Sequence, residues 1–238
     1  MSKFSIKYQT AEVVPPPFSL AIEIVGEIVQ NQELELSFEL TYLDRNTLTL
    51  EEIEEENFTE NDDFSWKGTL PKVWNDILLG NFKSAKPMTI SLLGEVQDFW
   101  ELSNDIKTFY PKNTEDWKYL LEELQQAIYE KAEKEAPLKL TFLKIHHQEK
   151  LVSEMIASFE KREIKLQIST KNQAEFLPWD ELNYILKNVF SAEFFPEKAE
   201  TKLPTKTGIY LNTGDEFWYE FGKSLRGNSK KIEQLFIV

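Results

Sequence analysis

The segment from residue 18 to residue 43 constrains the fold more than any other part of the chain. Apolar and polar residues alternate along two runs, which are separated by the polar gap Gln30-Asn31-Gln32. A period of two is typical of half-buried strands, so the segment predicts a long antiparallel hairpin that turns at this gap. The apolar positions are Phe18, Leu20, Ile22, Ile24 and Ile28 in the first run, and Leu34, Leu36, Phe38, Leu40 and Tyr42 in the second.

The register of this hairpin follows because both apolar sets must reach the same face of the sheet. A slip of one residue would turn one of the sets outward. The shortest sensible loop then places four glutamates on the opposite, outer face, in two directly opposed pairs: Glu23 with Glu39, and Glu27 with Glu35. We call these four residues the acidic strip.

Directly opposed like charges destabilise a sheet by a few tenths to about 1 kcal/mol per pair. Two interpretations of the acidic strip stay open. Either it is a solvated face on which salt screens the repulsion, or it is a binding surface for a basic partner or a cation. A stabilisation that is specific to a divalent metal or a basic peptide would favour the second interpretation.

The charge of the chain is concentrated at its N-terminal end. The net charge is −14, and residues 1–136 hold 12 Lys or Arg against 27 Asp or Glu, whereas the remaining residues hold 15 against 14. Such a field repels nucleic acid and anionic membranes and favours basic partners.

The chain has no cysteine, which excludes disulfides, thiolate zinc sites and cysteine nucleophiles. With neither a signal-peptide pattern nor a long apolar run, we expect a cytoplasmic location.

The remaining patterns predict an α+β fold with mixed β-sheets and packed helices. A helix over residues 148–161, between strands at 138–145 and 164–169, would form one βαβ unit with a right-handed crossover. Further strands are expected at 88–96, 208–211, 216–221 and 233–238, and further helices near Thr49, Leu70-Pro71, Thr114 and Pro178. We expect an acidic N-terminal half, residues 1–110, and a C-terminal half, residues 111–238, with one compact domain as the open alternative.

Short matches recur in the same order in the two halves and indicate an internal duplication as a hypothesis. Leu70-Pro71 and Leu177-Pro178 both precede a helix that is followed by Ser-Ala. The other matches are Leu36-Ser37-Phe38 with Leu140-Thr141-Phe142, Ile90 and Leu92 with Ile209 and Leu211, and Asp98-Phe99-Trp100 with Glu216-Phe217-Trp218. Their offsets are close to half of the chain, and a comparison of the two halves' topologies would test the hypothesis.

Motifs for catalysis are not found in the sequence. The only histidines, His146 and His147, are adjacent at the end of an expected strand, so their side chains should point to opposite faces and suit a shared metal poorly. We therefore expect no metal, no cofactor and no catalytic residues of a recognisable class. A basic cluster of Lys223, Arg226, Lys230 and Lys231 is the best candidate for contact with a phosphate or an acidic partner.

These observations favour a protein-interaction module that binds a basic protein through its acidic N-terminal surface, with nucleic acid and membranes excluded and the oligomeric state open. Two alternatives remain. The first is an inhibitor or immunity-type protein that neutralises a basic partner. The second is a hydrolase or transferase with a carboxylate-lined pocket, because sites assembled from scattered side chains leave no local motif.

Overall fold

A computed structural model of the protein describes residues 2–29, 32–88, 96–147 and 149–237, and its chain divides into two compact units, Met1–Ala132 and Glu133–Val238. The boundary lies after Ala132 rather than after residue 110. The reason is the longest helix, α3 (Thr114–Lys131), whose apolar side packs in the first unit: Trp117 contacts Phe82, and Tyr129 contacts Phe38. Helix α3 therefore belongs to unit 1 and not to the C-terminal half.

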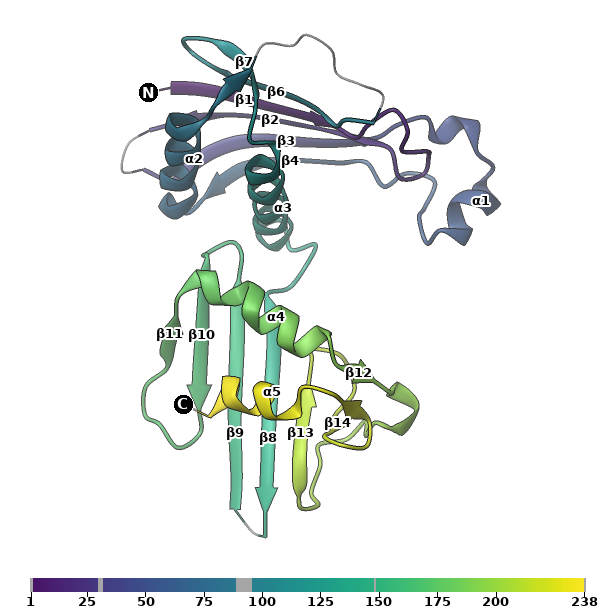
Figure 1. Ribbon diagram of the computed structural model, residues 1–238, viewed down its shortest axis with the longest axis vertical. Coiled ribbons are helices and arrows are strands. Elements are labelled where there is room, and N and C mark those ends of the chain that lie inside the picture. The colour runs from purple at the N-terminus through teal and green to yellow at the C-terminus, as the bar shows by residue number, and fades with distance from the viewer. Residues whose placement is uncertain (1, 30–31, 89–95, 148, 238) are drawn as a thin grey trace. The chain divides into compact units, whose positions relative to one another are not determined.

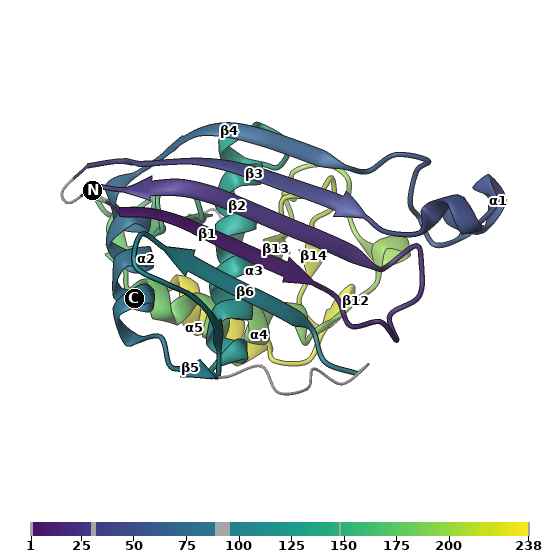
Figure 2. The ribbon, with the colours of Figure 1, turned by 90° about the horizontal axis from the view of Figure 1, so that it is seen from above.

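Unit 1 is a seven-stranded sheet with the strand order β4-β3-β2-β1-β6-β7-β5, and all of these pairings are antiparallel. Its strands are β1 (Ser2–Gln9), β2 (Leu20–Ile28), β3 (Leu34–Tyr42), β4 (Phe64–Leu70), β5 (Pro87–Met88), β6 (Phe99–Asn104) and β7 (Thr108–Pro111). Helices α2 (Lys72–Ser84) and α3 lie on one face of this sheet (Figures 1 and 2). We call that face inner and the opposite face outer.

The expected hairpin is present as β2 and β3, and its register is confirmed. Ile24 pairs with Phe38 and both side chains are fully buried. The expected turn lies largely outside the described residues, since residues 30 and 31 are not described. At the far end of β3, a 3-10 helix (Arg45–Thr47) and α1 (Leu50–Glu55) form an excursion before β4, and the Thr49–Glu52 capping box that opens α1 is formed as expected.

Unit 2 is a six-stranded antiparallel sheet with the order β11-β10-β9-β8-β13-β14, accompanied by the pair β12 and β15. Its strands are β8 (Leu138–His146), β9 (Glu149–Ser158), β10 (Glu163–Ile168), β11 (Glu175–Leu177), β12 (Glu193–Phe194), β13 (Gly208–Asn212), β14 (Tyr219–Glu220) and β15 (Leu225–Arg226). Helices α4 (Leu182–Phe190) and α5 (Ser229–Phe236) cover one face, where they bury the core of this unit (Figure 1).

The α+β class is confirmed, but the βαβ unit is wrong. Residues 149–158 form strand β9, which pairs antiparallel with β8 and β10. Its apolar residues fit a helical spacing because both faces of the strand carry them: Met155 and Ala157 point into the core, whereas Val152 and Ile156 lie on the other face. Such short apolar runs do not distinguish a helix from a strand, and pairing with two neighbours decides.

The expected C-terminal strand is also wrong. Residues 229–236 form helix α5, because Ile232 and Phe236 are one helical turn apart and both pack into the core of unit 2. The ring of Phe236 stacks on Phe142, at 5.3 Å between centroids. The strand expected at 216–221 is reduced to β14, and most of the one expected at 88–96 lies outside the described residues. Among the helices that the structure describes, none is long and apolar enough to span a membrane.

The two units share one order of connections. In each, a four-stranded antiparallel meander leads into a helix, a later strand returns to pair with the first strand, a further strand follows it, and a final helix closes the unit. Leu70-Pro71 and Leu177-Pro178 occupy equivalent places, at the junction of the fourth strand with its helix. The other repeats do not: Phe38 lies in β3 but Phe142 in β8, Trp100 lies in β6 but Trp218 precedes β14, and residues 90 and 92 are not described.

Candidate functional site

The acidic strip lies on the outer face of the unit 1 sheet. Glu23 pairs directly with Glu39, and Glu27 with Glu35, as the alternation of the hairpin requires. The two pairs are four residues apart along each strand, which corresponds to about 13 Å. The structure therefore brings all four predicted glutamates onto one rigid surface, in two rows that cross β2 and β3.

Lys7 is the residue that sequence reasoning missed at this surface. Its Nζ lies 3.9 Å from Oε1 of Glu23 and 3.5 Å from Oε1 of Glu101, because β1 sits between β2 and β6. The signal that could have found it is the alternation of Phe4, Ile6 and Tyr8 with Ser5 and Lys7, although no pattern in the sequence identifies the neighbours of such a strand. Lys7 therefore offsets part of the negative charge in the row formed by Glu23 and Glu39, at its Glu23 end.

The other three glutamates have no such compensation. Within the described part of the chain, Glu27, Glu35 and Glu39 form neither an ion pair nor a side-chain hydrogen bond. Lys3 stands opposite Glu27 in the register without forming an ion pair with it. These carboxylates are thus available to cationic groups from outside the molecule.

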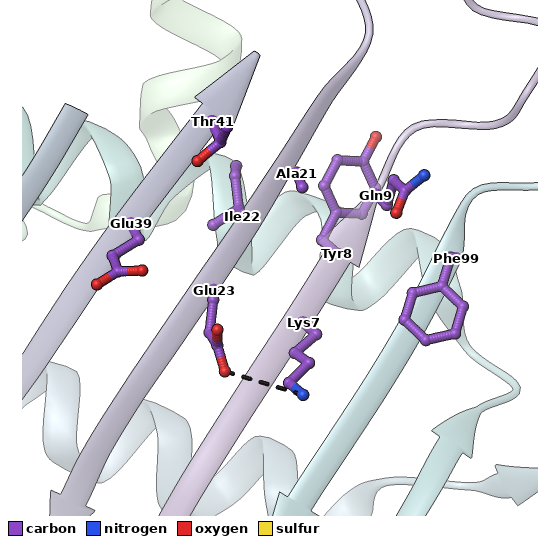
Figure 3. Close-up of a pocket in the computed structure, with 9 residues that line it drawn as sticks. All are labelled: Lys7, Tyr8, Gln9, Ala21, Ile22, Glu23, Glu39, Thr41 and Phe99. Atoms are coloured by element: carbon purple, nitrogen blue, oxygen red, sulfur yellow. Dashed lines mark ion pairs between the residues drawn. The ribbon is translucent and has the colours of Figure 1, made fainter. Parts of the chain in front are cut away.

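A shallow hollow of about 210 Å³ lies on the outer face beside Glu23 and Glu39 (Figure 3). Strands β1, β2, β3 and β6 line it, with Phe99 on one side and Thr41 near the opposite side. In Figure 3, Glu23 points toward Lys7, whereas the side chain of Glu39 extends away from both. The hollow is open to solvent, and its carboxylates stand apart instead of converging on one reacting position.

Tyr8, which contributes to the same hollow, acts as a structural donor. Its hydroxyl donates to Oδ2 of Asp98 at 3.0 Å, and the amide of Ala11 donates to Oδ1 of the same carboxylate at 3.0 Å. Burial, followed by the hydrogen bond to Asp98, raises the pKa of Tyr8 well above its usual value. Tyr8 therefore stays protonated at neutral pH and cannot serve as a base.

The basic cluster is distributed over three local structures of unit 2. Lys223 lies in the turn after β14 and forms an ion pair with Glu220 at 2.6 Å; this hydrogen bond raises the pKa of Lys223. Arg226 lies on β15, with its guanidinium 5.2 Å from the ring centroid of Phe195. Lys230 and Lys231 lie in the first turn of α5. Half of the cluster is thus engaged within the protein, although Lys230 and Lys231 are exposed.

A second hollow, of about 610 Å³, lies where the excursion between β3 and β4 meets the end of the hairpin. Its organising residue, Arg45, was not identified from the sequence. The side chain is only 8% exposed, and its Nη1 donates to Oδ2 of Asp62 at 2.6 Å and to the carbonyl of Thr59 at 2.9 Å. The guanidinium carbon lies 3.8 Å from the ring centroid of Tyr42 and 4.7 Å from that of Phe58.

The charged and polar groups of this second hollow interact with one another and so stabilise the local fold. Burial raises the pKa of Asp62, but hydrogen bonds from Thr59 and Arg45 outweigh burial, so the pKa of this carboxyl lies below its ordinary value. Burial raises the pKa of Tyr42, against the effect of the nearby Arg45. The groups hold one another in place, and we assign the hollow no ligand.

The histidines differ from the expectation. His146 ends β8, but His147 has a φ of 55° in the following turn, so strand alternation stops there. Their rings consequently contact each other, at 4.3 Å between centroids, and do not point to opposite faces. In the parts of the chain that the structure describes, no three His, Asp or Glu side chains are grouped so that they could hold a metal ion.

The charge divides between the units as unevenly as the sequence indicated. Residues 1–132 hold 11 Lys or Arg against 25 Asp or Glu, and residues 133–238 hold 16 against 16, so the entire net charge belongs to unit 1. Comparison with protein-family models, with curated proteins and with solved structures finds no match for this chain. The geometry of the outer face is therefore the basis for a functional proposal.

Proposed function

We propose that the protein is a cytoplasmic, non-catalytic interaction module that binds a basic partner protein through the outer face of unit 1. The observation that supports this proposal is the set of uncompensated carboxylates, Glu27, Glu35 and Glu39, held on a rigid sheet. Complementary charge raises the rate of encounter and fixes the orientation of a complex more than it adds affinity. A basic protein would also relieve the repulsion within the two opposed pairs.

An inhibitor that covers a basic toxin or nuclease would use the same surface and is one form of this proposal. A carboxylate-dependent hydrolase or transferase has less support. Such an enzyme needs two carboxyl groups that converge on a substrate in a cleft. The acidic strip instead lies on an open sheet, and the hollow beside it is shallow.

The test compares two variants of equal charge. In the first, Glu23, Glu27, Glu35 and Glu39 are all replaced by glutamine; in the second, glutamine replaces four exposed acids of the α1 region, Glu51, Glu54, Glu55 and Glu56. Capture from a lysate of the native host, quantified by mass spectrometry, should lose a stoichiometric basic partner with the first variant only. Each protein's far-ultraviolet circular dichroism would confirm that the fold is kept.

The control separates a specific surface from a general effect of charge. Equal losses in both variants would mean that net charge alone attracts the partner, and they would contradict the proposal. Retention of the partner by the first variant would contradict it as well. Binding should also weaken with added sodium chloride, because exposed charges are screened over roughly 10 Å at 0.1 M salt.

A further inference from the structure

Strand β4 forms one edge of the unit 1 sheet (Figure 2). It spans seven residues without a proline, and among the described residues no strand pairs with the edge of β4 that faces away from β3. A long open edge invites pairing with another chain, and proteins usually shorten or block such edges. Unit 2 does so at the equivalent edge, where β11 has only three residues. The length of β4 is therefore a difference between two sheets of the same topology.

The direction of the backbone groups on β4 follows from the hydrogen bonds of its neighbours. The amide of Leu43 donates to the carbonyl of Ser19 at 2.8 Å, which places the odd-numbered residues of β3 in hydrogen-bonded pairs with β2. The even-numbered residues of β3 consequently face β4, as the bond from the amide of Tyr42 to Asp63 also indicates. It follows that the N–H and C=O groups of Ser65, Lys67 and Thr69 point toward the open edge.

The same three residues direct their side chains to the outer face, next to the acidic strip. Ser65 pairs with Glu39 and Thr69 pairs with Glu35, so two short side chains separate the open edge from two unpaired carboxylates. A residue on an added strand would stand about 10 Å from each glutamate, across two strand spacings. Lysine or arginine can reach a glutamate over that distance when the residue between them is as small as serine or threonine.

We propose that β4 accepts an extended segment of the basic partner as an additional strand, with two Lys or Arg residues four positions apart directed at Glu35 and Glu39. The backbone groups of Ser65, Lys67 and Thr69 would supply the hydrogen bonds and the glutamates the specificity, as in other cases of strand addition. Lys67 lies between the two sites, so the middle outward residue of the segment is small or acidic. This inference rests on the proposed function and names the form of its partner.

A second copy of this chain is a poorer occupant of the edge. Antiparallel pairing of two β4 strands about Lys67 would place this lysine opposite its own copy, which is unfavourable. The two units 1 would also repel each other, since each carries the full −14 of the chain. Lys67 and the negative charge of unit 1 thus disfavour self-association through β4. They permit pairing with a basic segment that has no basic residue opposite Lys67.

The experiment uses the full-length chain and a synthetic peptide of alternating threonine and valine, with two lysines four residues apart. A peptide of the same composition with the lysines five residues apart puts them on opposite faces and is the control. Lys67→Pro removes one outward N–H that the fold does not use. Lys67→Ala removes the same charge but keeps that N–H. We expect Lys67→Pro to bind the first peptide about tenfold or more weakly than Lys67→Ala.

Hydrogen exchange of the wild-type protein gives a readout that does not depend on how well the proline variant folds. The amides of Ser65 and Lys67 should exchange quickly in the free protein and become protected when the peptide binds. Trp66 and Gly68 are internal controls, because their amides already face β3 and should be protected throughout.

Each outcome decides the inference. Equal affinities of the two Lys67 variants, unchanged exchange at β4, or no preference for lysines four apart would overturn strand addition. If strand addition is overturned but replacement of the acidic strip by glutamine still abolishes capture of the host partner, the proposed function is retained. If capture is unaffected by those substitutions, the proposed function itself is overturned, whatever the peptide does.

Discussion

At the scale of single residues, Arg45 shows how one side chain holds an excursion of the chain to the sheet. Its guanidinium joins the carbonyl of Thr59 and the carboxylate of Asp62, and it lies against the rings of Tyr42 and Phe58. A planar, delocalised cation is suited to both tasks at once, whereas an ammonium group is not. Arg45 therefore contributes to stability through contacts that do not involve the acidic strip.

We predict that Arg45→Lys lowers the free energy of unfolding by about 1–3 kcal/mol, although the charge is retained, because hydrogen bonds to charged groups contribute on this order. Urea denaturation followed by tryptophan fluorescence measures the change. The exposed Lys67 of strand β4 is the matched site: Lys67→Arg should change stability by less than about 0.5 kcal/mol. A similarly small effect at Arg45 would show that its contacts are dispensable.

At the scale of the element, the hairpin combines a stabilising inner face with a destabilising outer one. Glu27 and Glu35 oppose each other with no ion pair within the described residues, whereas Glu23 has Lys7 beside it. We predict that Glu35→Gln stabilises the fold by a few tenths to about 1 kcal/mol at low salt. Glu23→Gln should gain less, since it also loses the contact with Lys7.

Thermal unfolding at low and high salt measures this difference. The gain from Glu35→Gln should shrink as sodium chloride is added, because Glu35 is exposed and Glu27 is partly exposed to solvent. If the substitution destabilises the protein at low salt, then Glu35 has a favourable contact and the view of an uncompensated strip is wrong. A stabilising change that weakens partner binding is the pattern expected of a functional surface.

The elements also show why some structure could be predicted from the sequence. The register of β2 and β3 followed from parity together with the shortest sensible loop, since a shift of one residue would expose a whole apolar set. Strand β9 and helix α5 were misassigned because their short apolar runs fit both periods, and only contacts with distant residues, such as Phe142 with Phe236, decide between them. The four glutamates of the site were placed correctly for the same reason as the register, but Lys7 and the open edge of β4 depend on strand order, which no local pattern encodes.

At the scale of the whole molecule, the shared order of connections gives the hypothesis of duplication its support. Among the described residues, the repeats that match both in sequence and in place are the junctions Leu70-Pro71 and Leu177-Pro178 and the Ser-Ala pairs at the end of the helix that follows each. Short sequence repeats found among strands of similar composition are weak guides, and equivalent positions must be taken from topology. We propose that two related units have diverged, the first retaining the acid and the long edge, the second a neutral surface and a short edge.

Each unit should then be stable without the other. Unit 2 has its own buried cluster, contributed by its sheet and by α4 and α5, and its net charge is zero. We predict that residues 133–238, expressed alone, unfold cooperatively in urea and keep near-ultraviolet circular dichroism, because a domain of about 100 residues can bury enough surface to fold independently. A fragment that unfolds without cooperativity would mean that unit 2 requires unit 1. Binding of the basic partner should be retained by residues 1–132 and be absent from the fragment 133–238, since the acidic strip and β4 both lie in unit 1.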